Sequence, residues 1–373
     1  MPFKNGKIVN NQLVPYGCAT GIGSLPHLDP KAAVALVCQY LPEMPHWPQL
    51  PRKTVKEYFC TQFLQALSDI GLIQVEKGTK AFFLNEDDDW PGRLAEFYEL
   101  YLQAADGDLE ILNKFSFPLG SAEGFYCFYD ELVNKGTGQA RYLKGQVVGL
   151  LSVGFQVTDQ NRVPAYYDEQ LRDILLKQLS LQAAWQVKTL GRFGLPVIIF
   201  MDDPVIDSCG RYDRISVSRD DVQAELTEFA AFVRRFGGLA GVHSCSDLDW
   251  SILLSAGIDV ISFDTYQFAE SFALYPDLIQ QFLEQGGVIA WGVVPTDKKS
   301  LQEEEADTLI ARVVKLVSQL VKKGVDRQLL YAQSIITPAC GAGTLTEAEA
   351  ERIYQLTNFL AAEWRTIINQ CNC

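Results

Sequence analysis

Short apolar runs alternate with segments of helical periodicity through the second half of the chain. Each run stops at polar or turn-forming residues. The five runs are Pro196–Met201, Leu239–His243, Val260–Phe263, Gly287–Val294 and Ser334–Thr337. Continuous apolar runs of this length are typical of strands buried on both faces of a parallel sheet. The segments around them predict helices at Asp220–Phe236, Leu248–Ser255, Phe272–Gln285, Glu303–Lys323 and Thr346–Trp364.

The first half of the chain is less regular but supplies three more strand-like segments. These are Cys18–Ser24, Pro45–Gln49 and Tyr142–Val153. Eight strands alternating with helices favour a closed (β/α)8 barrel, the TIM barrel, over an open doubly wound sheet. We therefore expect one α/β domain over residues 1–373. The stretch Leu72–Asn134 is long for a single crossover, so we expect inserted elements there, in the first half of the barrel.

Each of the five runs ends in side chains that are able to do chemistry. These side chains are Asp202, His243 with Cys245, Asp264, Thr296 with Asp297, and Cys340. In parallel α/β folds the functional groups lie at the carboxyl ends of the strands. The pattern therefore predicts a site at that end of the barrel.

His243 and Cys245 are two residues apart in an extended segment, so their side chains point the same way. Imidazole nitrogen and thiolate sulfur are zinc ligands, and a catalytic zinc keeps three protein ligands and one open position. Cys340, in the turn after the last strand, can supply the third ligand. Asp264 is a candidate fourth ligand that a substrate thiol could displace. From spacing alone, the alternative of a buried histidine and cysteine in the core stays open.

The composition and the net charge of the chain bear on which kinds of molecule it binds. The chain has 373 residues, 48% of them hydrophobic, and a formal net charge of −14. A surface this acidic repels phosphate backbones and anionic lipids, so we expect neither nucleic acid nor a membrane as partner. Lys4 and Lys7 are followed by polar residues, and nine cysteines lack a disulfide-like spacing. We therefore expect a cytoplasmic protein that binds small molecules.

Several motifs at the predicted strands and their ends resemble those of the C-terminal catalytic half of cobalamin-independent methionine synthase. The resemblance runs from about Cys18 to Gly343. In the family's order, the motifs are Thr20–Pro26 (TGIGSLP), Lys144–Gly149 (KGQVVG), Met201–Pro204 (MDDP), His243–Cys245 (HSC), Asp259–Asp264 (DVISFD) and Pro338–Gly343 (PACGAG). The resemblance implies a zinc-dependent methyltransferase of methionine biosynthesis, which holds homocysteine as a zinc thiolate and methylates it.

The resemblance also implies roles for single residues at the substrate. Ile22 and Ser24 fall where backbone groups bind the amino-acid end of homocysteine. Asp202 falls on the acidic residue that binds the substrate amine, and it is our candidate catalytic residue. Gln49 falls at a second amine-binding position, where the family has a glutamate.

Four residues fall on the family's zinc ligands. These are His243, Cys245, Cys340 and Asp264, the last replacing a longer glutamate. The family's catalytic histidine after the seventh strand has no counterpart in Trp291–Asp297.

That departure leaves other functions open. Corrinoid-dependent methyltransferases of the uroporphyrinogen decarboxylase superfamily share the barrel and the His-x-Cys and Cys pattern. The second possible function is therefore methyl transfer between a methylcorrinoid and a thiol cofactor, with a methylcorrinoid protein as a possible partner. A non-catalytic barrel that binds a thiol or a metal is the third alternative.

Overall fold

The computed structural model describes residues 13–208 and 217–371, so Lys4 and Lys7 lie outside the described part. Seven parallel strands form the main sheet, in the order β1-β10-β9-β8-β7-β6-β4. Their bounds are β1 Cys18–Ala19, β4 Leu143–Val148, β6 Val197–Asp202, β7 Leu239–Ser244, β8 Val260–Phe263, β9 Val288–Val294 and β10 Ser334–Pro338. All five strands predicted in the second half are present within a residue or two of the expected positions.

Residues 46–49 join the two edges of this sheet. His46 makes a parallel bridge to Lys144 of β4, and Gln49 makes one to Ser24, which follows β1. The segment predicted as a short strand at Pro45–Gln49 therefore lies between the first and the third predicted strands, where a closed barrel needs it. The fold is an α/β TIM-barrel-like fold, as the alternation of runs predicted.

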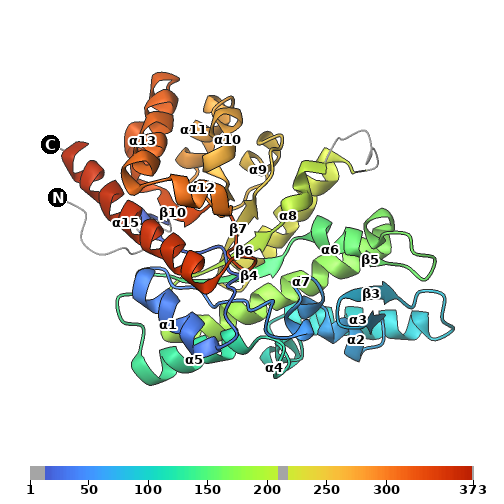
Figure 1. Ribbon diagram of the computed structural model, residues 1–373. Coiled ribbons are helices and arrows are strands. Elements are labelled where there is room, and N and C mark those ends of the chain that lie inside the picture. Colours follow the sequence, from blue (N-terminus) through green and yellow to red (C-terminus); the bar gives the residue numbers. More distant parts are fainter. Residues whose placement is uncertain (1–12, 209–216, 372–373) are drawn as a thin grey trace.

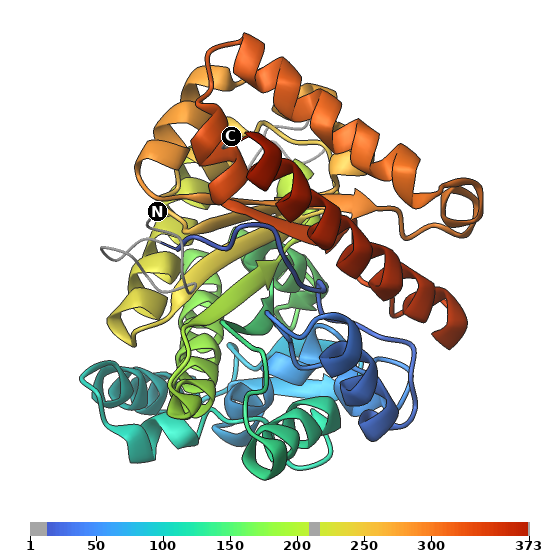
Figure 2. The same cartoon turned by 90° about the vertical axis from the view of Figure 1, so that its left-hand side faces the viewer.

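Helices surround the strands. Their bounds are α1 Pro30–Tyr40, α2 Gln65–Asp69, α3 Trp90–Ala105, α4 Leu109–Asn113, α5 Glu123–Lys135, α6 Leu150–Gln156, α7 Glu169–Leu190, α8 Arg219–Arg235, α9 Ser251–Leu254, α10 Thr265–Phe272, α11 Pro276–Glu284, α12 Lys298–Glu303, α13 Ala306–Lys322, α14 Arg327–Ala332 and α15 Glu347–Cys371. Helix α7 packs on β4 and β6, α8 on β7, α10 and α13 on β9, and α15 on β10 and β1 (Figure 1). In Figure 2 the strands lie between the orange and red helices of the C-terminal part and the blue and green helices of the first half. Among the described helices, none is both long enough and apolar enough to cross a bilayer.

The stretch between the second predicted strand and β4 carries elements beyond one crossover helix. Short 3-10 helices at Val55–Glu57 and Thr61–Phe63 precede α2. Strands β2 (Ile73–Glu76) and β3 (Lys80–Phe83) form an antiparallel hairpin, and β5 (Val157–Thr158) adds to it in parallel. Helices α3, α4 and α5 follow the hairpin, and α3 lies beside the small sheet in Figure 1, whereas α5 packs against α1. The expectation of inserted elements at residues 72–134 concerns this region.

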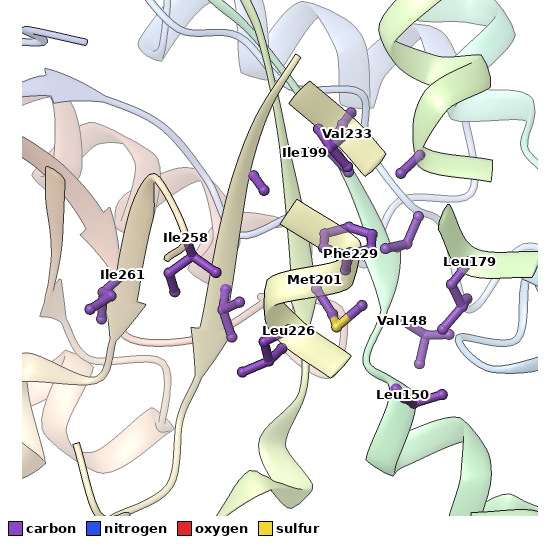
Figure 3. Packing of buried hydrophobic residues seen from close by; sticks show 14 of the residues in the cluster. Val148, Leu150, Leu179, Ile199, Met201, Leu226, Phe229, Val233, Ile258 and Ile261 are labelled. Carbon is purple, nitrogen blue, oxygen red and sulfur yellow. The ribbon is translucent and has the colours of Figure 1, made fainter. Parts of the chain in front are cut away.

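Two separate apolar cores follow from the alternation of side chains along the strands. The layer between strands and helices includes Ile199 and Met201 of β6, which face Leu226 and Phe229 of α8 (Figure 3). The neighbouring positions of β6, Ile198 and Phe200, belong to a second cluster inside the barrel. That inner cluster also contains Cys18, Met44, Tyr142, Val260, Val288, Ala290 and Ile335. The inner cluster fills the barrel below the carboxyl ends of the strands. The polar side chains that could bind a ligand therefore lie above it, at the mouth of the barrel.

The predicted strand Tyr142–Val153 was wrong in its second half, because β4 ends at Val148 and α6 begins at Leu150. The Asp203 carboxylate accepts hydrogen bonds from the backbone N–H groups of Leu151 and Ser152 and so starts the helix. A Cβ on Gly149 would lie 2.0 Å from that of Asp203, so only glycine fits at the turn. An apolar run cannot show this switch, because the group that causes it comes from another strand.

Two predicted helices in the second half begin later than expected. The helix expected over Phe272–Gln285 is α11, which begins at Pro276, and Phe272 is the last residue of the separate helix α10. The helix expected over Glu303–Lys323 is α13, which begins at Ala306. Glu303 is the last residue of the separate helix α12, and Glu304 after it is extended. Proline at the start of α11 disfavours a helical conformation for the residue before it, which accounts for the break between α10 and α11.

His46 is held as a neutral imidazole inside the fold. Its Nδ1 lies 2.9 Å from the carbonyl of Trp47, which can only accept, so Nδ1 carries the hydrogen. Its Nε2 then accepts from the hydroxyl of Tyr354 at 2.6 Å. Burial, with the nearby charge of Lys144, lowers the pKa of His46 to about 3.

This depressed pKa predicts a loss of stability in acid. In the unfolded chain His46 is protonated below about pH 6.5, whereas in the folded chain it stays neutral until about pH 3. The unfolded state therefore binds more protons between these two pH values, and the unfolding free energy falls as the pH falls through them. Between pH 7 and pH 5 we expect the wild type to lose about 2 kcal/mol more unfolding free energy than His46→Gln. Urea unfolding at the two pH values measures this, and equal losses in the two proteins would contradict it.

Candidate metal centre

Three side chains of ligand type meet at the mouth of the barrel. His243 lies near the end of β7, Cys245 directly follows that strand, and Cys340 lies two residues after β10. One ring nitrogen of His243 and the two sulfur atoms all lie within 4.8 Å of one another. Around a tetrahedral zinc, such ligand atoms are about 3.5–3.8 Å apart, so a small movement would bring the three to one ion.

The turn that carries Cys340 is fixed from two sides. Its register shifts at Thr337 and Pro338, and the N–H of Ala339 donates to the carbonyl of Val294 at 2.8 Å. The N–H of Ala342 donates to the carbonyl of Ser24 at 3.0 Å. A Cβ on Gly341 would lie 2.2 Å from the Ser24 hydroxyl oxygen, so the turn after the last strand closes tightly on the one after the first.

The state of His243 fits a metal ligand. The residue is 2% exposed, and its Nε2 is buried without a hydrogen-bond partner. Its Nδ1 lies 3.0 Å from the hydroxyl of Ser262. Buried ring nitrogens nearly always have a partner, so an unpaired Nε2 beside two sulfur atoms calls for a ligand. The donor set of one nitrogen and two sulfurs is one that zinc prefers.

The two thiols share a hydrogen bond. This bond lowers the pKa of Cys245 well below its usual value, against the opposing effect of burial. The same bond, together with burial, raises the pKa of Cys340. A thiolate at Cys245 is therefore favoured before any ion is bound, which is the form that ligates a metal.

Asp264 lies nearby but does not join the group of three. Its Oδ1 accepts from the backbone N–H of Gln267 at 2.9 Å, and it caps the start of α10. Burial and the charge of Cys245 raise its pKa to about 6, and the hydrogen bond with Gln267 opposes them. Its role as fourth ligand stays a prediction, and its capping bond gives the carboxylate a second, structural function.

Asp202 lies beside this group, at the end of β6 and in register with His243. Its Oδ1 is buried without a hydrogen-bond partner. Burial raises the pKa of Asp202 to about 6, and the charges of Lys144 and His243 oppose the rise. The structure therefore places an unpaired carboxylate oxygen next to the three ligand-type side chains.

Lys144 is a residue of this site for which the sequence indicated no role. Its ammonium is buried, donates to the carbonyl of Ile22 at 2.5 Å and lies 4.4 Å from the centre of the Phe200 ring. Burial lowers its pKa to about 8, and the charge of Asp202 opposes this. A lysine within a strand that is otherwise buried was the available signal, because unpaired lysines are almost never fully buried.

The neighbouring Asp203 has a structural function instead. Its carboxylate accepts from the N–H groups of Leu151, Ser152 and Val205 and from the hydroxyl of Ser152. Adjacent residues at a strand end face opposite ways, and here one aspartate faces the mouth while the other caps α6.

The three other predicted substrate residues lie around the first two strand ends. Ile22 is buried and accepts from Lys144, and Ser24 accepts from the N–H of Gly343 at 3.3 Å. Gln49 is buried, and its Nε2 donates to Oε1 of Gln62 at 2.6 Å. The NH2 group of Gln49 is therefore already engaged by a neighbouring side chain.

The contact between Ser262 and His243 predicts a loss of metal affinity on mutation. When Nε2 binds an ion, Nδ1 carries the hydrogen and donates it to the hydroxyl of Ser262, which holds the ring in the orientation that the ion needs. We expect Ser262→Ala to weaken zinc binding about 10–100-fold, as measured by competition with a chromophoric chelator. Ser244→Ala is the matched control, because the hydroxyl of Ser244 is buried next to His243 without a partner. Equal zinc affinity in the two variants would contradict the role of Ser262.

Comparisons with known proteins place the chain in no family. No family model matches the sequence, and no curated protein matches it either. Among solved structures, a B12-independent methionine synthase from Shewanella sp. W3-18-1 in complex with selenomethionine is 16% identical, with a TM-score of 0.42 over 65% of this chain and 66% of that chain. A GH113 β-mannanase from Alicyclobacillus acidocaldarius is 11% identical, with a TM-score of 0.34 over 66% of this chain and 78% of that one. At TM-scores below 0.5 these likenesses bear on neither activity nor ligands, which have to be argued from the site itself.

Proposed function

We propose that this protein is a zinc-dependent enzyme that methylates a small thiol, with homocysteine as the candidate substrate. The observation that carries the proposal is the meeting of His243, Cys245 and Cys340 at the barrel mouth, with a buried and unpaired Nε2. Three ligands of this kind leave one position for a substrate, as catalytic zinc sites do.

Side chains at the barrel mouth are suited to hold the zinc ion and to bind the substrate. A zinc ion held by the three side chains would lower the pKa of a thiol that takes the remaining position, so that its sulfur becomes a nucleophile near neutral pH. Cys245 already favours its thiolate form, and Ser262 holds the ring of His243 by Nδ1. The unpaired Oδ1 of Asp202 is an acceptor for the ammonium group of an amino-acid substrate.

The reaction balances without a redox partner. A bond forms between the substrate sulfur and the methyl carbon as the bond from that carbon to its donor breaks. The proton of the thiol leaves to solvent. Lys144 keeps the charge of Asp202 partly compensated during this exchange, because its ammonium is buried nearby.

The methyl donor distinguishes two versions of the proposal. Trp291–Asp297 has no histidine, and Asp297 there accepts from the N–H of Ser300 at 2.9 Å as the cap of α12. This segment thus lacks the group that the methionine synthase resemblance would use to protonate folate. A methylcorrinoid protein, which needs no such proton, is the second candidate donor. Six cysteines are free thiols: Cys18, Cys38, Cys60, Cys127, Cys245 and Cys340. The location in the cytoplasm stays a proposal.

The test supplies zinc-loaded protein and saturating homocysteine with either methyltetrahydrofolate or methylcobalamin. Formation of methionine with one donor, abolished by Cys340→Ser, supports the enzyme and identifies that donor. Tight binding of homocysteine without methylation by either donor would contradict the enzyme and favour a non-catalytic thiol-binding barrel.

A further inference from the structure

Gln146 is a buried amide at the barrel mouth whose oxygen has no partner. It lies in β4, two residues after Lys144 on the same face of the strand, and it is 2% exposed. Its Nε2 donates to the carbonyl of Trp47 at 3.1 Å, whereas its Oε1 is buried without a hydrogen bond. Sequence patterns gave no role to this residue.

The orientation of the amide is determined by its surroundings. The carbonyl of Trp47 can only accept, so the NH2 group of Gln146 has to face it and the oxygen has to face away. The amide also lies against Gly23, because a Cβ on Gly23 would be 2.9 Å from the carboxamide carbon of Gln146. The carbon and the nitrogen of the amide therefore lie against the turn that follows β1, and the oxygen faces away from the carbonyl of Trp47.

A second unpaired acceptor lies on the neighbouring strand. In the register of β4 and β6, Gln146 pairs with Phe200 and Val148 pairs with Asp202. Side chains of Phe200 and Asp202 share a face, so Asp202 is one layer above the partner of Gln146. Its Oδ1 is also buried without a partner. Buried acceptors without donors are rare, and two on adjacent strands at one mouth call for one ligand that donates hydrogen bonds.

We propose that Gln146 is a second acceptor, beside Asp202, for the ammonium group of the substrate and so makes the site selective for an aminothiol over a thiol without that group. This inference rests on the proposed function, since the thiol of the same molecule binds at the metal centre. Two acceptors cannot hold a carboxylate, because neither offers a hydrogen. Gln146 adds an acceptor without a second negative charge.

The experiment compares two thiols on zinc-loaded protein by calorimetry. Homocysteine carries the ammonium group, and 4-mercaptobutyrate is the same molecule without it. We expect the wild type to bind homocysteine at least about 10-fold more tightly, as a charge-assisted hydrogen bond implies. Gln146→Met should reduce this preference at least about 5-fold and leave the affinity for 4-mercaptobutyrate unchanged. The carbonyl of Trp47 keeps its bond from His46 in this variant.

Controls separate this inference from the function on which it rests. Gln182→Met replaces another buried glutamine with an unpaired Oε1, on α7 and outside the site, and should keep the wild-type preference. Gln146→Glu keeps an acceptor and should keep or increase the preference, which also provides a test if Gln146→Met does not fold. An unchanged preference in Gln146→Met, or a lost one in Gln146→Glu, would overturn the inference alone. Failure of the wild type to bind either thiol would overturn the proposed function and this inference with it.

Discussion

His243→Ala and Cys340→Ser are each expected to abolish stable zinc binding. Wild-type protein should retain about one zinc ion per chain after dialysis against a mild chelator, as a site with three protein ligands does. Loss of an outer-shell partner costs about 10–100-fold in affinity, and loss of a ligand itself should cost more than about 100-fold. Elemental analysis of the dialysed proteins measures the remaining zinc.

Cys38→Ser is the matched control for these variants. Cys38 is a partly buried free thiol in α1, away from the group of three. It should keep the wild-type zinc content. Retention of zinc by His243→Ala and Cys340→Ser, or its loss from Cys38→Ser alone, would show that the ion binds elsewhere.

Asp203→Ala is expected to destabilise the fold more than loss of an ordinary helix cap. The variant loses a buried carboxylate that accepts three backbone N–H groups and one hydroxyl. Each hydrogen bond to a charged group contributes about 1.5–3 kcal/mol, and with incomplete additivity we expect a loss of about 3 kcal/mol or more. Denaturant unfolding at neutral pH measures the difference in unfolding free energy.

Asp297→Ala provides the comparison for a cap with a single bond. Asp297 is exposed and accepts from the N–H of Ser300 at the start of α12. Such caps typically contribute about 1 kcal/mol. Equal losses in the two variants would mean that Asp203 is not the anchor of α6 that its contacts indicate.

Much of the barrel could be predicted because its strands are buried on both faces. Apolar runs such as Val260–Phe263 and the polar residues that end them identify both the strands and the end at which the site lies. The break between β4 and α6 could not be predicted from Leu150 and its neighbours, which are apolar in either structure. It depends on Asp203, which is distant along the chain and meets α6 only after folding.

The candidate site was predicted in part, for a similar reason. The spacing of His243 and Cys245 and the turn at Cys340 indicated ligands, because the types of side chain are unusual there. Ser262 and Gln146 gave no such signal, since a serine or a glutamine in a strand is unremarkable. The roles that we propose for them rest on contacts across strands that form only on folding, with Ser262 at 3.0 Å from His243 and the buried Oε1 of Gln146 without a donor.

X-ray absorption at the zinc edge tests the central claim most directly. Zinc-loaded wild-type protein should show two sulfur ligands and one imidazole nitrogen in the first shell, from Cys245, Cys340 and His243. Addition of homocysteine should raise the sulfur count to three while the imidazole remains. A spectrum with fewer than two sulfurs, or one that homocysteine leaves unchanged, would contradict the account.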